Sequence, residues 1–296
     1  MIHVLAVSPS DAITKMQALC ASEAVFNVVL SFPMTLPASN RGFLAAYLEK
    51  AKRWQNKNAP LMLEFNHGQY MHEHSDPIKY LANELQRKAT SNRAIVSLVS
   101  TKQIFGSEDG ALPSFMLVQV GFDGKTQETL FLTAYYRALE VTAFLPINVT
   151  ELALISEQIA DRITTISSID VTIHAFRAHS DPGNTGHEKA RLDMATETEI
   201  HEWVESENYT EIAGLLREKA APASIVNVSG LIALREEIVS AGWPAPIRTE
   251  LDQAVGVLTR LKAIRAAGTH GKRIDEAQNE ASTLLRHIAG LVAAKG

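Results

Sequence analysis

Residues 114–137, SFMLVQVGFDGKTQETLFLTAYYR, decide the fold class. Both ends of this stretch are rich in β-branched, aromatic and other apolar residues, a composition typical of strands. The dipeptide Asp123-Gly124 between them is a strong signal for a tight hairpin turn. The stretch therefore predicts two neighbouring antiparallel strands, over 114–122 and 129–137.

Further strands are expected on either side of this hairpin. The first residues, MIHVLAVSPSD, have no basic segment before their apolar stretch, so they predict a first strand rather than a signal peptide. Three more β-branched runs predict strands at 25–32, 93–100 and 169–176. Apolar residues recur at helical spacing over 76–89 and 148–163. We expect an α+β fold with a largely antiparallel sheet flanked by helices.

The strand pattern stops at HSDPGNTG, residues 179–186, which has the composition of a loop. Alanine, leucine and glutamate dominate the C-terminal third of the chain, where helices are predicted over 208–221, 229–241, 247–267 and 272–294. We therefore expect two domains, 1–186 with the sheet and 187–296 all-helical. Leucines at spacings of three and four favour a bundle within the chain, while a surface for a protein partner stays open.

Composition narrows the class of protein. The 296 residues carry 28 basic and 33 acidic side chains in mixed order, with a net charge of −5. This balance gives no support to general nucleic-acid or acidic-membrane binding. The single cysteine, Cys20, excludes an internal disulfide and fits a reducing compartment, and no apolar segment reaches membrane-spanning length. We expect a soluble cytoplasmic protein.

Two spaced motifs resemble a known family. Residues 113–119, P-S-F-M-L-V-Q, and 137–148, R-A-L-E-V-T-A-F-L-P-I-N, match patterns of the thymidylate synthases without a gap. The family patterns are P-C-H-x-x-x-Q-F and R-S-x-D-x-x-x-G-x-P-x-N. Residues 91–93 resemble the family's S-R-R, and His179 its histidine after a strand. The resemblance covers roughly 65–182, is closest to the shorter archaeal-type synthases, and implies their fold and a homodimer formed through the sheet.

The same resemblance implies a damaged catalytic centre. In the family a cysteine thiolate adds to uracil C6 of deoxyuridylate, and a reduced folate supplies the methylene. Ser114 stands at the nucleophile position, and a hydroxyl needs a base that Phe115, in place of the family's histidine, does not supply. Glu140 replaces an aspartate that frames the base, and Phe144 replaces a glycine of the folate wall. We expect folate-dependent methyl transfer to be lost, and a reduced folate to bind only if activity persists.

The nucleotide-holding residues are better preserved. Arg137 suits a forked contact to a phosphate, and Arg93 supplies a second, donated in the family across the dimer. Asn148 suits N3-H and O4 of a uracil together. The residues that the resemblance assigns to the nucleotide are Arg93, Gln119, Arg137, Ala138, Asn148, His179 and Asp181. Two of them depart from the family: Ala138 removes a phosphate contact and Asp181 replaces a tyrosine. The expected ligand is a pyrimidine nucleotide, a uridylate.

Ordinary structural roles stay open for several of these residues. Ser114 suits a strand start, Arg137 and Arg93 suit ion pairs, and Asn148 suits the cap of a helix beginning NVTEL. The histidines of HGQYMHEH, residues 67–74, match no metal-ligand spacing, so no metal is expected.

These alternatives lead to three possible functions. The first is a pseudoenzyme that senses or sequesters a pyrimidine nucleotide. The second is an enzyme of altered chemistry, such as a C5 methyl- or hydroxymethyltransferase or a nucleotide hydrolase, in which Glu140, His179 or Asp181 activates Ser114 or a water. The third is a scaffold that binds a protein through the helical region.

Overall fold

Two compact units make up the chain. The first contains residues 1–60 and 65–182, and the second contains 61–64 and 183–296. The predicted boundary at 186/187 lies outside the described residues. The computed structural model describes residues 1–63, 65–73, 76–106, 112–123, 126–181, 188–222, 226–266 and 272–296.

A six-stranded sheet in the order β1-β2-β6-β5-β4-β3 forms the centre of the first unit. Its pairs β2–β6, β4–β5 and β3–β4 are antiparallel, while β1–β2 and β5–β6 are parallel. The strands are β1 (Ile2–Leu5), β2 (Val25–Thr35), β3 (Ile95–Ser97), β4 (Phe115–Gly121), β5 (Thr129–Glu140) and β6 (Ser168–His179). The predicted α+β class and mostly antiparallel sheet are confirmed. β4 and β5 pair as predicted, although Gly124 of the expected turn lies outside the described residues.

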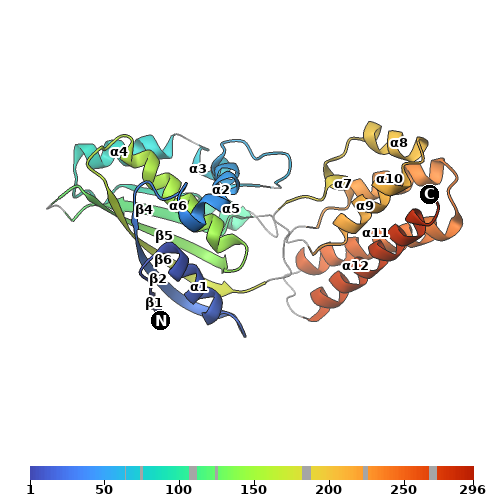
Figure 1. Ribbon diagram of the computed structural model, residues 1–296, viewed down its shortest axis with the longest axis horizontal. Helices are drawn as coiled ribbons and strands as arrows, with labels where there is room; N and C mark the ends of the chain where they lie inside the picture. The colour runs from blue at the N-terminus through green and yellow to red at the C-terminus, as the bar shows by residue number, and fades with distance from the viewer. Residues whose placement is uncertain are drawn as a thin grey trace. The chain divides into compact units, whose positions relative to one another are not determined.

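Helix α6 (Phe144–Ala160) is the main cover of this sheet. It packs against β5, and around it lie α1, α2, α4 and the 3-10 helix η1; Figure 1 shows it between α4 and α1. Because α6 is apolar on nearly every side, twelve of its 17 residues are buried. The remaining helices of the unit are α1 (Pro9–Leu19), η1 (Gly42–Tyr47), α2 (Leu48–Gln55), α3 (His67–Met71), α4 (Pro77–Arg87) and α5 (Thr101–Gly106).

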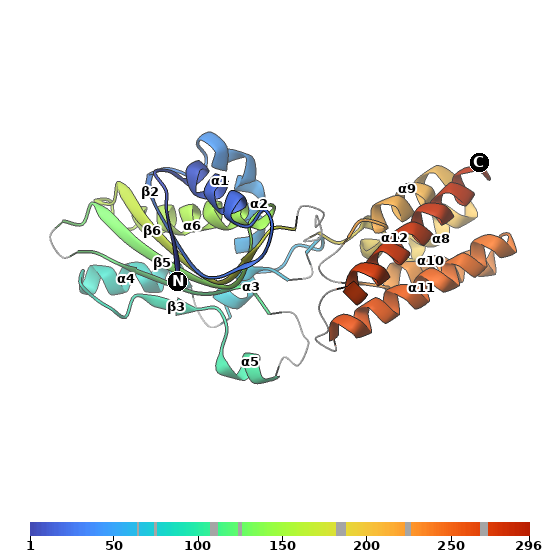
Figure 2. The same cartoon turned by 90° about the horizontal axis from the view of Figure 1, so that it is seen from below.

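The two faces of the sheet differ in exposure. Along β5 the buried residues Leu130, Leu132, Ala134 and Tyr136 alternate with more exposed ones, as a strand with one covered face requires. Figure 2 shows the strands as one curved layer with α1 and α2 on the same side of it. Away from the buried face, four aromatic residues are 40–51% exposed, and two of them, on β2 and β6, touch edge to face. We call Phe26, Phe131, Tyr135 and Phe176 the open sheet face.

The second unit is helical throughout its described residues and has a core of its own. Its helices are α7 (Arg191–Met194), α8 (Glu197–Glu205), α9 (Tyr209–Lys219), α10 (Ser229–Ser240), α11 (Ala245–Ala266) and α12 (Lys272–Ala293). The last four match the predicted helices; α7 and α8 were missed, although Thr196 and Glu199 form a capping box at the start of α8. No helix of the described chain is both long and apolar enough to cross a membrane.

Helix α3 is fixed against the end of α2. The side-chain Nδ2 of Asn66 donates to the carbonyls of Arg53 (2.9 Å) and Asn56 (2.7 Å). A Cβ at Gly68 would lie 2.1 Å from the carbonyl oxygen of Asn56, so only glycine permits this approach. These contacts determine the position of His67, the first residue of α3.

We predict that Gly68→Ala lowers the free energy of unfolding of the first unit by at least about 1–3 kcal/mol, because the new methyl group collides with backbone that cannot yield cheaply. Urea unfolding of the full chain measures the effect. The control is Gly121→Ala in β4, where a Cβ meets nothing within 4 Å. Equal stability of the two variants would contradict the close approach of α3 to α2.

Candidate functional site

Ser114 and Arg137 lie side by side at the start of β4. The carbonyl of Ser114 accepts the backbone N–H of Arg137 at 3.0 Å. The Arg137 guanidinium donates to the carbonyls of Leu112 (2.7 Å) and Pro113 (3.3 Å). Partial burial lowers the pKa of the Arg137 guanidinium from its ordinary value. No described carboxylate pairs with Arg137, so the ion-pair interpretation finds no support there.

The Glu140 carboxylate is fully engaged by the backbone. Glu140 is 8% exposed at the end of β5. Its two oxygens accept four backbone N–H groups at 2.6–3.1 Å, from Thr142, Ala143, Phe144 and Asp181. Glu140 therefore caps α6 and ties the end of β6 to it. Because backbone N–H groups already occupy both carboxylate oxygens, the contacts disfavour the predicted role of Glu140 as an activating base.

His179 and Asp181 lie beside Glu140. The carbonyl of His179 accepts the N–H of Val141 at 2.9 Å, and Asp181 reaches Glu140 through its own N–H. Burial, followed by the charge of Arg177, lowers the pKa of His179, so its imidazole is neutral at pH 7. Its buried Nδ1 has no hydrogen-bond partner among the described residues. A neutral imidazole with an unused nitrogen suits a sugar hydroxyl, the role predicted for it.

Gln119, on β4, and Arg93, two residues before β3, form a separate group. The side chain of Gln119 donates to the carbonyl of Asn92 at 3.1 Å, and the carbonyl of Arg93 accepts the Tyr80 hydroxyl at 2.7 Å. The Arg93 side chain is exposed, and no hydrogen bond or ion pair between described residues joins it to Arg137. Ala138 lies on β5, in register with β6. The single chain thus does not bring Arg93 to Arg137.

Asn148 lies inside α6 rather than at its start. The helix begins at Phe144, and its first turn is capped by Glu140, so the prediction that Asn148 caps this helix is wrong. Asn148 is 4% exposed. Its side-chain amide makes no hydrogen bond with any described residue.

A buried histidine–carboxylate pair escaped prediction. Nδ1 of His67 lies 2.7 Å from Oε2 of Glu151, and their side chains are 6% and 0% exposed. Within the part of the chain that the structure describes, the other Glu151 oxygen and the hydroxyl of fully buried Tyr136 have no hydrogen-bond partner. Burial, followed by the charge of Glu151, raises the pKa of Tyr136 well above its ordinary value. The sequence signal was an acid in the middle of an otherwise apolar helix.

The one cysteine does not replace the missing nucleophile. Cys20 is 2% exposed, and burial, together with the negative charge of Glu140, raises the pKa of its thiol. A protonated, enclosed thiol is unreactive. Within the described ranges, no group of three or more histidine, cysteine or acidic residues is arranged to hold a metal; His74 lies outside them.

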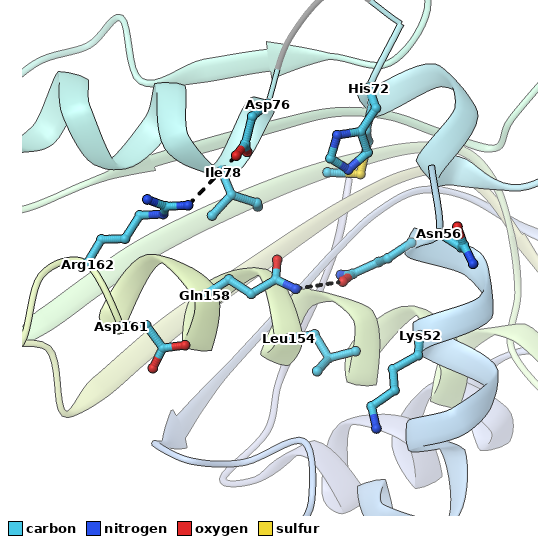
Figure 3. A pocket seen from close by; sticks show the side chains of 11 residues that line it. Lys52, Asn56, His72, Asp76, Ile78, Leu154, Gln158, Asp161 and Arg162 are labelled. Atoms are coloured by element: carbon cyan, nitrogen blue, oxygen red, sulfur yellow. Dashed lines mark hydrogen bonds and ion pairs between the residues drawn. The ribbon is translucent and has the colours of Figure 1, made fainter. Parts of the chain in front are cut away.

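A hollow of about 700 Å³ lies on another side of α6, between α2, α3 and α4 (Figure 3). Gln158 donates to Gln55 at 3.5 Å, and Arg162 lies 3.7 Å from Asp76. None of the predicted site residues lines it. Cationic and anionic side chains both contribute to its wall, so it selects for neither sign of charge.

Comparisons with known proteins give a likeness to solved structures alone. No protein-family model matches the chain, and no curated protein matches it. Among solved structures, the thymidylate synthase from T4 phage matches with 17% sequence identity and a TM-score of 0.35. The match covers 48% of this chain and 48% of that enzyme, so the chain spans about half of the enzyme's length.

We predict that Glu140→Ala lowers the free energy of unfolding of the first unit by about 2–4 kcal/mol. It leaves several N–H groups without an acceptor, and each buried unpaired donor costs about 1–3 kcal/mol. Chemical denaturation measures the loss, with exposed Glu128→Ala at the other end of β5 as the control. A loss no greater than that of the control would show that Glu140 does not hold α6.

Proposed function

We propose that this protein is a thymidylate synthase-like protein of the cytoplasm that binds a pyrimidine nucleotide and has lost folate-dependent methyl transfer. The observation that carries the proposal is the juxtaposition of Ser114 and Arg137. The nucleophile position and the expected phosphate ligand are 23 residues apart in the sequence, yet they share a backbone hydrogen bond at 3.0 Å.

The free amide of Asn148 supports recognition of a base. An amide that makes no hydrogen bond with the described protein is available to a ligand that completes its hydrogen bonds. One acceptor and two donors match N3-H and O4 of uracil. A sugar hydroxyl fits the neutral imidazole of His179. The phosphate, the base and the sugar of the nucleotide therefore each have a matching side chain.

The loss of methyl transfer follows from the surroundings of Ser114. The next side chain, Phe115, is fully buried and stacks on Tyr136 with ring centroids 4.9 Å apart. Phe144, at the expected folate wall, packs edge to face on Trp54, with ring centroids 5.8 Å apart. Because the Glu140 carboxylate is occupied and the Cys20 thiol is enclosed, neither supplies an activated nucleophile. A sensing or sequestering role fits a site that binds without turnover.

An enzyme of altered chemistry is the second candidate, and one observation favours it. The pair of His67 and Glu151 has the arrangement by which a carboxylate orients an imidazole to take a proton. In this alternative His67 replaces Glu140, His179 and Asp181 as the base that activates a water.

The open sheet face supports a homodimer. Four aromatic side chains on β2, β5 and β6 leave a large apolar area unpaired, and such faces mark interaction surfaces. A second copy of the chain would cover it and would bring Arg93 of the partner subunit toward the phosphate.

Calorimetric titration with a uridylate tests the nucleotide site. We expect Arg137→Ala to weaken binding by about 10- to 100-fold, the value of one charge-assisted hydrogen bond to phosphate. Asn148→Asp should also weaken uridylate binding and favour a cytidylate, because a carboxylate repels O4 but accepts from an amino group. The matched control is Arg162→Ala, on the far side of α6. Absence of binding to any pyrimidine nucleotide by the wild-type chain would refute the proposed function.

Sedimentation at micromolar concentration tests the dimer. We expect the wild-type chain to be a dimer and Phe131→Glu to be a monomer, because a charge cannot be buried unpaired in the interface. Phe105→Glu on α5, at an 82% exposed position outside the sheet, should leave the dimer intact. A monomeric wild-type chain would rule out the dimer.

A further inference from the structure

The buried pair of His67 and Glu151 lies next to the predicted nucleotide site. Contacts or sequence positions on β4, β5 and α6 connect the pair to residues predicted to bind the nucleotide. The His67 ring contacts Phe115, the neighbour of Ser114, with centroids 5.4 Å apart. Tyr136, stacked on Phe115, precedes Arg137. Glu151 lies three residues after Asn148 on α6, so the two side chains share one face of the helix.

The pair fixes which nitrogen of His67 carries the proton. A carboxylate oxygen accepts hydrogen bonds, so the contact of Glu151 Oε2 with Nδ1 assigns a ring proton to Nδ1. The second ring nitrogen, Nε2, then presents a lone pair and makes no hydrogen bond with a described residue. Trp54 and Phe115 pack around the ring and hold its orientation.

Stability alone does not account for this pair. Replacing both partners of a buried polar contact by apolar side chains of similar volume is often neutral or stabilising, and the surroundings here are aromatic. One oxygen of Glu151 also has no hydrogen-bond partner in the described ranges of the chain. Buried polar groups left incomplete in this way call for an explanation through a ligand or a reaction.

We infer that His67, oriented by Glu151, is a ligand-binding residue of the nucleotide site, whose Nε2 accepts a hydrogen bond from an N–H or O–H group of the bound pyrimidine nucleotide. Glu151 is the positioning residue. The inference rests on the proposed function and adds a hydrogen-bond acceptor to the donors supplied by Arg137 and Asn148. Loss of this acceptor should therefore weaken binding without altering the phosphate contact.

Glu151→Gln gives the sharpest test, because the amide can donate to Nδ1 and so move the imidazole proton to Nε2. Nitrogen-15 spectra of histidine-labelled full-length protein distinguish the two tautomers. We expect the Nδ1-H form in the wild type, the Nε2-H form in the variant, and uridylate affinity reduced at least 10-fold by calorimetry. The control is Glu157→Gln, a half-buried carboxylate of α6 that holds Ala38 and Ser39, which should bind as the wild type does.

The double variant His67→Phe with Glu151→Leu separates binding from folding. It replaces the pair by apolar groups, so it should unfold at or above the wild-type temperature and still lose at least 10-fold in uridylate affinity. Wild-type affinity in both this variant and Glu151→Gln would show that the pair is only structural and overturn the inference. An Nε2-H tautomer in the wild type would also overturn it. If the wild type itself bound no pyrimidine nucleotide, the proposed function would fail first, and the inference with it.

Discussion

The fold of the first unit depends on the Glu140 carboxylate, which accepts hydrogen bonds from four backbone N–H groups. Glu140 ends β5, and its oxygens hold the first turn of α6 and the residue two past the end of β6. A helix N-terminus has N–H groups without partners within the helix, and a buried acid there satisfies them and complements the helix dipole. Because α6 is the main cover of the sheet, this contact sets the position of every side chain that α6 carries into the site.

Four buried polar residues on α6 divide into two kinds. The hydroxyls of Thr150 and Ser156 donate to carbonyls one turn back, at 2.8 and 2.9 Å, so the helix itself satisfies them. Asn148 has no partner among the described residues, and Glu151 keeps one oxygen unpaired while its other oxygen meets His67. Polar groups that the helix satisfies require no further explanation. The two that it does not satisfy, Asn148 and Glu151, lie three residues apart on one face of α6. A ligand on that face would be able to form the hydrogen bonds that these side chains lack within the helix.

Local pattern was enough to predict most of the fold. The strands, α4 and the long C-terminal helices carry periodic apolar residues, and the predicted hairpin of 114–122 with 129–137 implies that Ser114 lies near Arg137. The start of α6 was misplaced because Ala143 offers no side-chain cap, and the true cap, Glu140, comes from the preceding strand. The pairing of His67 with Glu151 joins residues 84 apart in the sequence, so no periodic pattern of residues indicates it. Its only local sign was a carboxylate that an apolar helix would not carry without a partner.

The substitutions at 114 and 115 are coupled to that pair. The resemblance implies a histidine at 115, but the side chain there is wholly buried, stacked on Tyr136 and edge to face with His67. A second imidazole in this aromatic cluster would need a hydrogen-bond partner that Phe115 does not. The imidazole of this region now comes from α3, with Asn66 and Gly68 fixing the helix and Glu151 fixing the ring. Where the resemblance implies an imidazole on β4, this chain therefore has a phenylalanine, and the buried imidazole next to it is held on α3.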